Sequence, residues 1–342
     1  MIPARPGPWG APLAPVYAAT VGLRGFAYDR GWFSSFHAGV PTFCVGGLEV
    51  GGTGKTPVAR WLLRMLQARG HRPGLLSRGY GRRRRDLVIR RPREAADAEA
   101  IGDEPALIAR AVDVGVAAFG DRVVAARRLR EEVDVDCLVL DDGFAHRRLA
   151  RDIDIVVLRA GAPLESLRML PWGTLRERPS ALQRADVLWF HDRNSEPRPV
   201  SFQQRRWASD SHLVVASSSR LVLPSGLGRQ DVLLVTGIAR GDRVRRSLAE
   251  AGIDVVEHLE FADHHRFNAR DEGRIRDRQR AHGGPPVVVT AKDAVKLGRW
   301  SLPLSVIDVE VVIDDASEAR LYRRLSQAFE DHARHVLPVR RS

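Results

Sequence analysis

The sequence Gly51-Gly52-Thr53-Gly54-Lys55-Thr56-Pro57 constrains the fold more than any other part of the chain. It follows the apolar run Phe43–Val45 and precedes a helical pattern that begins at Val58. A glycine-rich turn between a strand and a helix lets backbone N–H groups surround a polyphosphate, and the helix N-terminus adds its positive dipole end. In such a loop Lys55 would reach the outer phosphates, and the hydroxyl of Thr56 would hold Mg²⁺.

The motif departs from the standard phosphate loop at one position. The standard loop begins with glycine where this chain has Glu49, so the form present is the shorter Gly-Gly-x-Gly-Lys-Thr variant. A glycine turn that merely precedes a helix is the alternative interpretation. This alternative is disfavoured because Lys55 and Thr56 directly follow Gly54, as they do in phosphate loops. We therefore predict that the chain binds a nucleoside triphosphate.

Composition narrows the class of protein. A chain of 342 residues with 44% hydrophobic and 28% charged residues is long enough for two α/β domains. Cys44 and Cys137 lie far apart in apolar, strand-like runs, so we expect packed thiols and neither a disulfide nor a metal site. The formal net charge of +12 indicates an anionic partner: nucleic acid, a phospholipid surface or a phosphorylated substrate.

The N-terminal segment 1–36 is unusually aromatic. Between residues 9 and 36 its only charges are Arg24, Asp29 and Arg30. Its large apolar residues are Trp9, Leu13, Val16, Tyr17, Val21, Leu23, Phe26, Tyr28, Trp32, Phe33 and Phe36. The segment contains neither the ~20 apolar residues that span a bilayer nor a secretory signal pattern. It either lies in a membrane interface or packs as a helix against the next domain, and the pattern leaves both interpretations open.

Apolar runs alternate with helical patterns through the first half of the chain. Strands are expected near 43–45, 74–76, 87–89, 114–118, 135–140, 153–158 and 187–190, and helices near 58–68, 104–112 and 122–132. This alternation predicts an α/β fold with a doubly wound, mainly parallel sheet.

The composition changes between residues 192 and 229. This stretch is rich in Ser, Arg and Pro, with short apolar pieces at 213–215 and 221–223. Strands are then expected near 232–235, 255–258, 287–290 and 306–312, with helices near 243–251, 270–280 and 318–329. We therefore divide the chain into the leader 1–36, a phosphate-loop domain 37–200, a linker 201–229 with short strands, and a second, smaller α/β domain 230–342.

The segment Cys137–Gly143 has the form of a Walker B strand. A buried strand delivers the carboxylates of Asp141 and Asp142 to its carboxyl end, where ligands bind in open α/β sheets. One of the two would orient Mg²⁺ opposite the phosphate loop. Asp-Asp-Gly is also an ordinary turn sequence, so the assignment depends on its pairing with the phosphate loop.

Two further segments place polar groups near the same edge. Asp103 and Glu104 start a helix, where they either complement its dipole or act as a base and a metal ligand. Arg78, within Ser77–Gly81, follows the second predicted strand and could contact phosphate, although its glycines are equally consistent with a simple turn.

The second half contains two suggestive motifs. Asp263-His264-His265 lacks regular metal-ligand spacing, so proton transfer or phosphate binding is favoured over zinc. Thr290-Ala291-Lys292-Asp293 differs in spacing from the guanine-binding motif of GTPases, and GTP is not inferred.

In this order, the motifs resemble the tetraacyldisaccharide 4′-kinase family of the lipid A pathway. The resemblance rests on the segments 45–57, 77–81, 102–105, 140–149, 175–179, 261–265 and 290–296. It implies two α/β/α domains joined by a β linker, and transfer of the γ-phosphate of ATP to the 4′-hydroxyl of a tetraacyldisaccharide 1-phosphate. It also implies a peripheral location on the cytoplasmic face of the Gram-negative inner membrane, against an anionic lipid surface, without a nucleic-acid partner.

The resemblance assigns roles to individual residues. Lys55 and Thr56 would bind phosphate and Mg²⁺, and Asp103 would be the general base, assisted by His264. The remaining assignments are metal and phosphate positioning by Glu104, Asp141 and Asp142, and lining of the site by Glu177 and His146.

Three single positions and one short segment depart from the usual family pattern. Gly47 stands where the family usually has Asn, Ala145 where it has Gln, and Ala291 where it has Glu, while Pro171-Trp172-Gly173-Thr174 replaces Pro-Ala-Gly-Pro. Two rival functions remain: a switch ATPase or metallochaperone with the same loop, and a nucleic-acid-dependent ATPase built around the arginines of 82–93.

Overall fold

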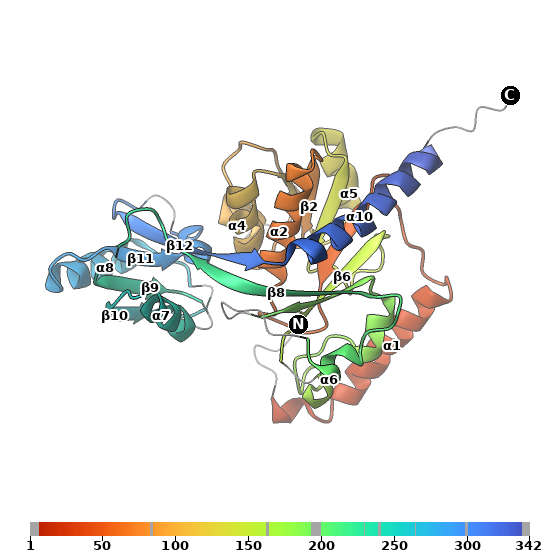
Figure 1. The fold of residues 1–342 in the computed structure, drawn as a ribbon, viewed down its shortest axis with the longest axis horizontal. Helices are drawn as coiled ribbons and strands as arrows, with labels where there is room; N and C mark the ends of the chain where they lie inside the picture. Colours follow the sequence, from red (N-terminus) through yellow and green to blue (C-terminus); the bar gives the residue numbers. More distant parts are fainter. Residues whose placement is uncertain are drawn as a thin grey trace.

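The computed structural model describes residues 7–82, 85–161, 164–192, 200–228, 230–238, 241–263, 265–297 and 300–336. Within these ranges the backbone forms one mainly parallel, twelve-stranded sheet covered by helices (Figure 1). The predicted α/β fold with a mainly parallel sheet is confirmed.

The strands lie in the spatial order β10-β9-β11-β12-β8-β7-β6-β1-β5-β2-β4-β3. Their bounds are β1 (Thr42–Gly46), β2 (Pro73–Ser77), β3 (Val88–Arg90), β4 (Gly115–Ala118), β5 (Cys137–Asp141), β6 (Ile153–Arg159), β7 (Val187–His191), β8 (Leu213–Val222), β9 (Val232–Thr236), β10 (Val255–Glu260), β11 (Val287–Thr290) and β12 (Leu304–Val312). Antiparallel pairing joins β3 to β4 and β8 to β12, and the other pairs are parallel.

The helices connect these strands. Their bounds are α1 (Ala14–Asp29), α2 (Lys55–Ala68), α3 (Ala98–Ile101), α4 (Asp103–Val112), α5 (Arg122–Glu132), α6 (Phe202–Arg205), α7 (Gly241–Glu250), α8 (Ala269–Ala281), α9 (Ala291–Ala294) and α10 (Asp315–Val336), with 3₁₀ turns η1 (Pro8–Gly10), η2 (Leu164–Ser166) and η3 (Pro179–Arg184). The six predicted helices are all present, and α10 continues beyond the predicted end at 329.

The main core lies on both faces of the sheet, because alternate residues of a strand point to opposite faces. Phe43 of β1 joins a cluster that includes residues of α2, α4 and α10, whereas Cys44 joins a cluster with residues of α5. Cys44 and Cys137 are both buried and free, as predicted for packed thiols.

A smaller part of the sheet is formed by β9–β12, at the left of Figure 1. Leu233 packs with Ile275 of α8 on one face, and Leu234 packs with Leu248 of α7 on the other. The last helix, α10, returns to the main core, where Leu321 is fully buried. The domain division given above remains our proposal as far as β12, supported by the separate apolar clusters around β9–β12, whereas α10 packs on the phosphate-loop domain.

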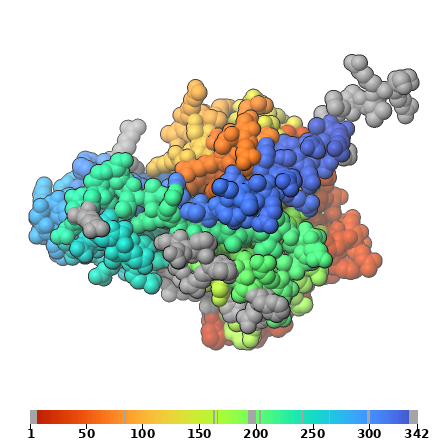
Figure 2. Space-filling view, viewed as in Figure 1, coloured from red at the N-terminus to blue at the C-terminus, as the bar shows by residue number. Residues whose placement is uncertain are grey.

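The segment 213–222 is one ten-residue strand, β8, so the prediction of two short pieces at 213–215 and 221–223 is wrong. Its middle contains three serines, which look like linker sequence but are accommodated inside the sheet. β8 pairs with β7 as far as Ser217 and with β12 from Ser218 onward. It therefore runs from the main part of the sheet into the smaller part, which also contacts α2 through β12 (Figure 2).

Candidate active site

The glycine-rich loop lies between β1 and α2, as the sequence predicted. β1 ends at Gly46 and α2 begins at Lys55, with Gly51 at φ 80° and Gly54 at φ 101°. These left-handed dihedrals favour glycine because a Cβ atom would strain the turn. The hydroxyl of Thr53 is buried and has no hydrogen-bond partner among the described residues, so the loop holds a polar atom that a ligand could satisfy.

Lys55 points back across this loop. Its Nζ lies 3.5 Å from Oδ1 of Asp142 and 3.3 Å from the carbonyl oxygen of Glu49. The structure thus brings the predicted phosphate-binding lysine together with one of the two predicted Walker B carboxylates. A cation beside a glycine loop at the carboxyl edge of parallel strands is suited to bind a phosphate chain.

The two adjacent carboxylates have opposite electrostatic environments. Burial raises the pKa of Asp141 well above its usual value, and the negative charges of Glu104 and Asp142 raise it further. Burial alone would also raise the pKa of Asp142, but hydrogen bonds from Arg176 and the charge of Lys55 lower it to about 2. Asp142 is therefore held as an anion, whereas Asp141 loses its proton less readily than an exposed aspartate does.

Glu104 and Asp103 are the first two residues of α4, and Gly102 precedes them as the N-cap. Gly102, at φ 99°, packs against the backbone of Gly79 and Tyr80, and an added Cβ would lie 2.9 Å from the Tyr80 oxygen. This packing places the start of α4 beside the 77–81 loop. Two segments that the sequence singled out separately are therefore neighbours.

Arg176 is a site residue that the sequence analysis missed. Its guanidinium donates to both oxygens of Asp142, at 2.7 and 2.5 Å, and to the carbonyls of Gly47 (3.3 Å) and Glu49 (3.1 Å). Its own N–H donates to the Leu48 carbonyl at 2.7 Å. Arg176 lies within the motif 175–179, next to Glu177, whose carboxylate pairs with Arg184.

Arg122 is the second missed residue. It is buried at the start of α5, and its pKa is lowered to about 10 by burial and by the positive charge of Arg78, against the pull of Asp142 and Asp141. Its Nε has no hydrogen-bond partner among the described residues. Arg78 therefore lies in the electrostatic neighbourhood of Arg122, an arginine that only burial distinguishes from its many counterparts in the sequence.

His146 lies in the same neighbourhood. Burial and the charge of Arg122 lower its pKa to about 4, so its ring is neutral at pH 7. Its Nδ1 is buried without a hydrogen-bond partner among the described residues. A neutral ring with an unsatisfied nitrogen can accept or donate a single hydrogen bond at this position.

Segments next to the smaller part of the sheet contact the 77–81 loop and α4. Arg266 donates to the Gly81 carbonyl at 3.1 Å, and Arg110 of α4 donates to the Ala294 carbonyl at 3.1 Å. His264 lies outside the described residues. Of its neighbours, Asp263 lies 3.7 Å from Lys292, and His265 pairs with Asp271 at 2.9 Å.

Helix α1 lies against the site region and also exposes apolar side chains. Tyr17 donates to the Arg176 carbonyl at 3.3 Å, and Arg147 donates to the Gly25 carbonyl at 2.9 Å. The helix buries small residues, such as Ala18, and exposes large ones, such as Val16 and Leu23, each at 65%. Both interpretations of the leader thus agree with its packing. In the described part of the chain, no helix has the length and apolarity to cross a membrane.

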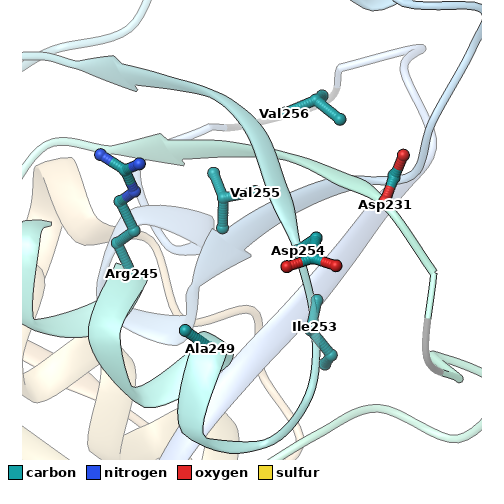
Figure 3. Close-up of a pocket in the computed structure, with 7 residues that line it drawn as sticks. All are labelled: Asp231, Arg245, Ala249, Ile253, Asp254, Val255 and Val256. Carbon is teal, nitrogen blue, oxygen red and sulfur yellow. The ribbon is translucent and has the colours of Figure 1, made fainter.

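A pocket of about 330 Å³ lies elsewhere, between α7 and β10 (Figure 3). Its walls include Asp231, Asp254 and Val255, which lie at the starts of β9 and β10. Ligand sites of parallel sheets form at the carboxyl ends of strands, and this pocket is at the amino ends. We therefore assign the candidate active site to the phosphate-loop edge and not to this pocket.

Comparison with known proteins identifies the family. A family model described as tetraacyldisaccharide-1-P 4′-kinase (LpxK) matches residues 8–329. The chain belongs to this family. It is 40% identical to a tetraacyldisaccharide 4′-kinase of Anaeromyxobacter dehalogenans strain 2CP-C, over 86% of this chain and 84% of the relative. The identity is 37% to that of Aeromonas salmonicida strain A449, over 86% of this chain and 87% of the relative.

A solved member of the family has the same fold. LpxK from Aquifex aeolicus, in complex with ATP, superposes with a TM-score of 0.74 at 26% identity, over 93% of this chain and 98% of that one. Gly47 is one of the positions that depart from the usual family pattern, and it lies beside Lys55. A Cβ there would lie 3.4 Å from Cδ of Lys55, so the absence of a side chain leaves space beside that lysine.

Proposed function

We propose that this protein transfers the γ-phosphate of ATP to the 4′-hydroxyl of a tetraacyldisaccharide 1-phosphate in lipid A biosynthesis. One observation carries the proposal: in a chain of this family, Lys55 and the Asp141–Asp142 pair meet beside the glycine loop at the carboxyl edge of the sheet. Curated relatives are named as tetraacyldisaccharide 4′-kinases, and the Aquifex aeolicus structure contains ATP.

The loop Gly51–Thr56 is the proposed binding site of the triphosphate. Lys55 would give up part of its interaction with Asp142 to bind the outer phosphates. This exchange is feasible because the ion pair is long, with 3.5 Å between Nζ of Lys55 and Oδ1 of Asp142. The N–H groups at the start of α2 would bind phosphate oxygens, since these groups have no partner inside the helix. Arg176 holds Asp142 and the loop carbonyls in place during this exchange.

The residues at this edge fit Mg²⁺. Mg²⁺ prefers oxygen ligands and usually combines one or two carboxylates with substrate phosphates and water. Thr56, Asp141, Asp142 and Glu104 are the proposed oxygen donors, and the buried Asp141 Oδ1 has no hydrogen-bond partner among the described residues. When bound, the ion supplies positive charge that stabilises the phosphates during transfer.

Asp103 is the proposed general base. Its carboxylate would take the proton of the 4′-hydroxyl as that oxygen attacks the γ-phosphorus, and the bond to the β-phosphate oxygen breaks. The packing of Gly102 on Gly79 and Tyr80 fixes the start of α4, and the Arg110 bond to Ala294 links α4 to the smaller part of the sheet. We also propose that His264 assists Asp103. The proposed lining residues of the site are Arg78, His146 and Glu177.

The acceptor is a lipid, and we propose that α1 carries the protein to it at the cytoplasmic face of the Gram-negative inner membrane. Val16, Leu23 and Phe26 of α1 are exposed, and arginines such as Arg24 lie among them. Apolar residues that enter the interface, together with cations that attract anionic headgroups, are typical of interfacial helices. The Tyr17–Arg176 hydrogen bond would then place the site next to the lipid surface.

Transfer of label tests the proposed function directly. The purified protein is incubated with γ-labelled ATP, Mg²⁺ and a lipid A disaccharide precursor, and the lipid is extracted and counted. The matched control is the same precursor already phosphorylated at the 4′ position. Label in the first lipid and none in the control is expected; label in neither would overturn the proposal.

The same assay separates the two rival functions. ATP turnover without any lipid would favour a switch ATPase. Turnover that rises with DNA or RNA, and not with lipid, would favour a nucleic-acid-dependent ATPase.

A further inference from the structure

His191, the last residue of β7, packs directly against the phosphate loop. Its side chain is buried, with 1% exposed. A Cβ added to Gly54 would overlap Cδ2 of the His191 ring and would lie 3.0 Å from its Cγ and Nε2. The ring therefore occupies the space that any side chain at position 54 would need. Gly54 immediately precedes Lys55 and has the left-handed φ of 101°, so this contact is made at the turn that aims the lysine.

Two hydroxyl groups of β8 fix the orientation of this ring. Nδ1 lies 2.8 Å from Oγ of Ser217, and Nε2 lies 3.1 Å from Oγ of Ser219. The indole N–H of Trp189 also donates to Ser217 Oγ at 2.6 Å. Because indole is only a donor, Ser217 accepts from Trp189 and can give its own proton to Nδ1. Nε2 and the Ser219 hydroxyl then share the second hydrogen bond of the ring.

The two serines lie on either side of the point where β8 changes partner. His191 is paired with Ser217 across the β7–β8 ladder, and the β8–β12 ladder begins at Ser218. His191 thus contacts the phosphate loop on one side and, on the other, the crossover between the main and the smaller part of the sheet.

We propose that His191 is a positioning residue of the phosphate loop. Its ring holds the Gly54 turn in the conformation that presents the loop N–H groups and Lys55 to a triphosphate, and anchors that turn to Ser217 and Ser219. This inference rests on the proposed function only in requiring that the loop binds ATP. A loop that is already ordered binds its ligand more tightly, because less conformational entropy is lost on binding.

Direct nucleotide binding tests the inference without the lipid acceptor. Affinity for a fluorescent ATP analogue with Mg²⁺ is measured for the wild type, His191→Ala and His191→Asn. We expect His191→Ala to raise the Kd at least about tenfold, because the Gly54 turn loses its support. His191→Asn should recover part of the affinity, since its amide can still hydrogen-bond Ser217. In the lipid assay, the KM for ATP should rise more than kcat falls, with the KM for lipid unchanged.

The matched control is Trp189→Phe, which removes a different hydrogen bond to the same Ser217 and leaves the His191 ring against Gly54. This variant should lower the Tm yet bind the nucleotide as the wild type does. If it weakens nucleotide binding as much as His191→Ala does, general destabilisation explains both, and the positioning role is overturned.

Two other outcomes are informative. Equal affinities for the wild type and His191→Ala would overturn the inference, whereas a wild type that binds no nucleotide would overturn the proposed function instead. If His191→Ala does not fold, Ser219→Ala removes only the Nε2 partner. It should raise the Kd about threefold, and an unchanged Kd would then contradict the proposal.

Discussion

The carboxylate of Asp142 and the guanidinium of Arg176 form a two-point hydrogen-bonded pair, with N–O distances of 2.7 and 2.5 Å. The same guanidinium reaches the carbonyls of Gly47 and Glu49, so one side chain joins the Walker B carboxylate to the phosphate loop. Arg176 is well suited to this role because its planar fork matches a carboxylate and leaves a further N–H to donate.

Arg176→Lys should therefore be a severe change despite conserving the charge. A single ammonium group cannot donate in two fixed directions to Asp142 while also reaching the loop carbonyls. We expect kcat/KM to fall about a hundredfold, roughly 3 kcal/mol of transition-state stabilisation. Steady-state kinetics of phosphate transfer measure this, with Arg178→Lys, at an exposed neighbouring position, as the control. Equal activity in the two variants would remove Arg176 from the site.

Asp103→Asn should separate nucleotide binding from transfer. The amide conserves the shape of the side chain but cannot accept the proton of the acceptor hydroxyl. ATP affinity should stay within about twofold of the wild type, while transfer falls roughly 10²–10⁴-fold. The control is Asp97→Asn, which alters the carboxylate that caps the preceding helix α3 and should leave transfer nearly intact. Full transfer in Asp103→Asn would exclude this residue as the base.

Sequence reasoning succeeded where the chemistry is local. The strand, glycine turn and helix around Lys55 occupy neighbouring residues, and Asp141 and Asp142 end a buried strand whose position the apolar pattern gives. Their convergence then follows from the parallel sheet, since the carboxyl ends of its strands share one edge.

Sequence reasoning failed where tertiary packing selects one residue among many. Arg176 reaches Asp142 from 34 positions away, and nothing local predicts that contact. Arg122 differs from the other arginines of α5 chiefly in being buried. The serines of β8 read as linker because their role, holding the ring of His191, exists only once β7 lies beside them.

His146 should give the protein a measurable acid sensitivity. Its pKa is about 4 in the folded state, against a usual value of 6.5, so the unfolded chain binds a proton between these pH values that the folded chain does not. The contribution of the neutral ring to stability is complete above pH 6.5 and is lost as the pH falls through 4, at a limiting slope of about 1.4 kcal/mol per pH unit.

His146→Gln should flatten that dependence, because glutamine does not titrate. Urea unfolding at several pH values between 7 and 4 measures the free energy of unfolding of both proteins. His37→Gln, at an exposed position, is the matched control and should leave the slope unchanged. A variant with the wild-type slope would show that His146 is not buried as a neutral group.

The exposed apolar side chains of α1 and of the turn that follows it should determine vesicle binding. Leu23 and Trp32 are exposed at 65% and 68%, and the main packing contact that their replacement removes is the edge-on contact of Trp32 with Phe26. Leu23→Ser with Trp32→Ser should lower the fraction that sediments with anionic phospholipid vesicles several-fold, with an unchanged Tm. Val124→Ser on α5, where the side chain is 40% exposed, is the control. Unchanged sedimentation of the double variant would favour the packed-helix interpretation.

Two ion pairs join α2 to β12, and they should differ in their contribution to stability: the buried pair of Arg60 should contribute strongly and the exposed pair of Arg64 weakly. Arg60, only 4% exposed, donates to both carboxylate oxygens of Asp308, at 2.9 and 2.7 Å, and to the Val309 carbonyl. Arg60→Leu leaves these acceptors without their donor and should lower the free energy of unfolding by about 2–3 kcal/mol. Arg64, one turn further along α2, pairs with Glu310 at 3.2 Å but is 42% exposed.

Arg64→Leu is therefore the matched control and should cost less than about 1 kcal/mol. The double variant Arg60→Leu with Asp308→Leu should recover part of the loss, because it removes the unpaired carboxylate as well as its partner. Denaturant unfolding of the four proteins measures all these differences. If Arg60→Leu and Arg64→Leu cost the same, burial does not strengthen the Arg60 pair, and the contact between α2 and β12 depends on its apolar residues instead.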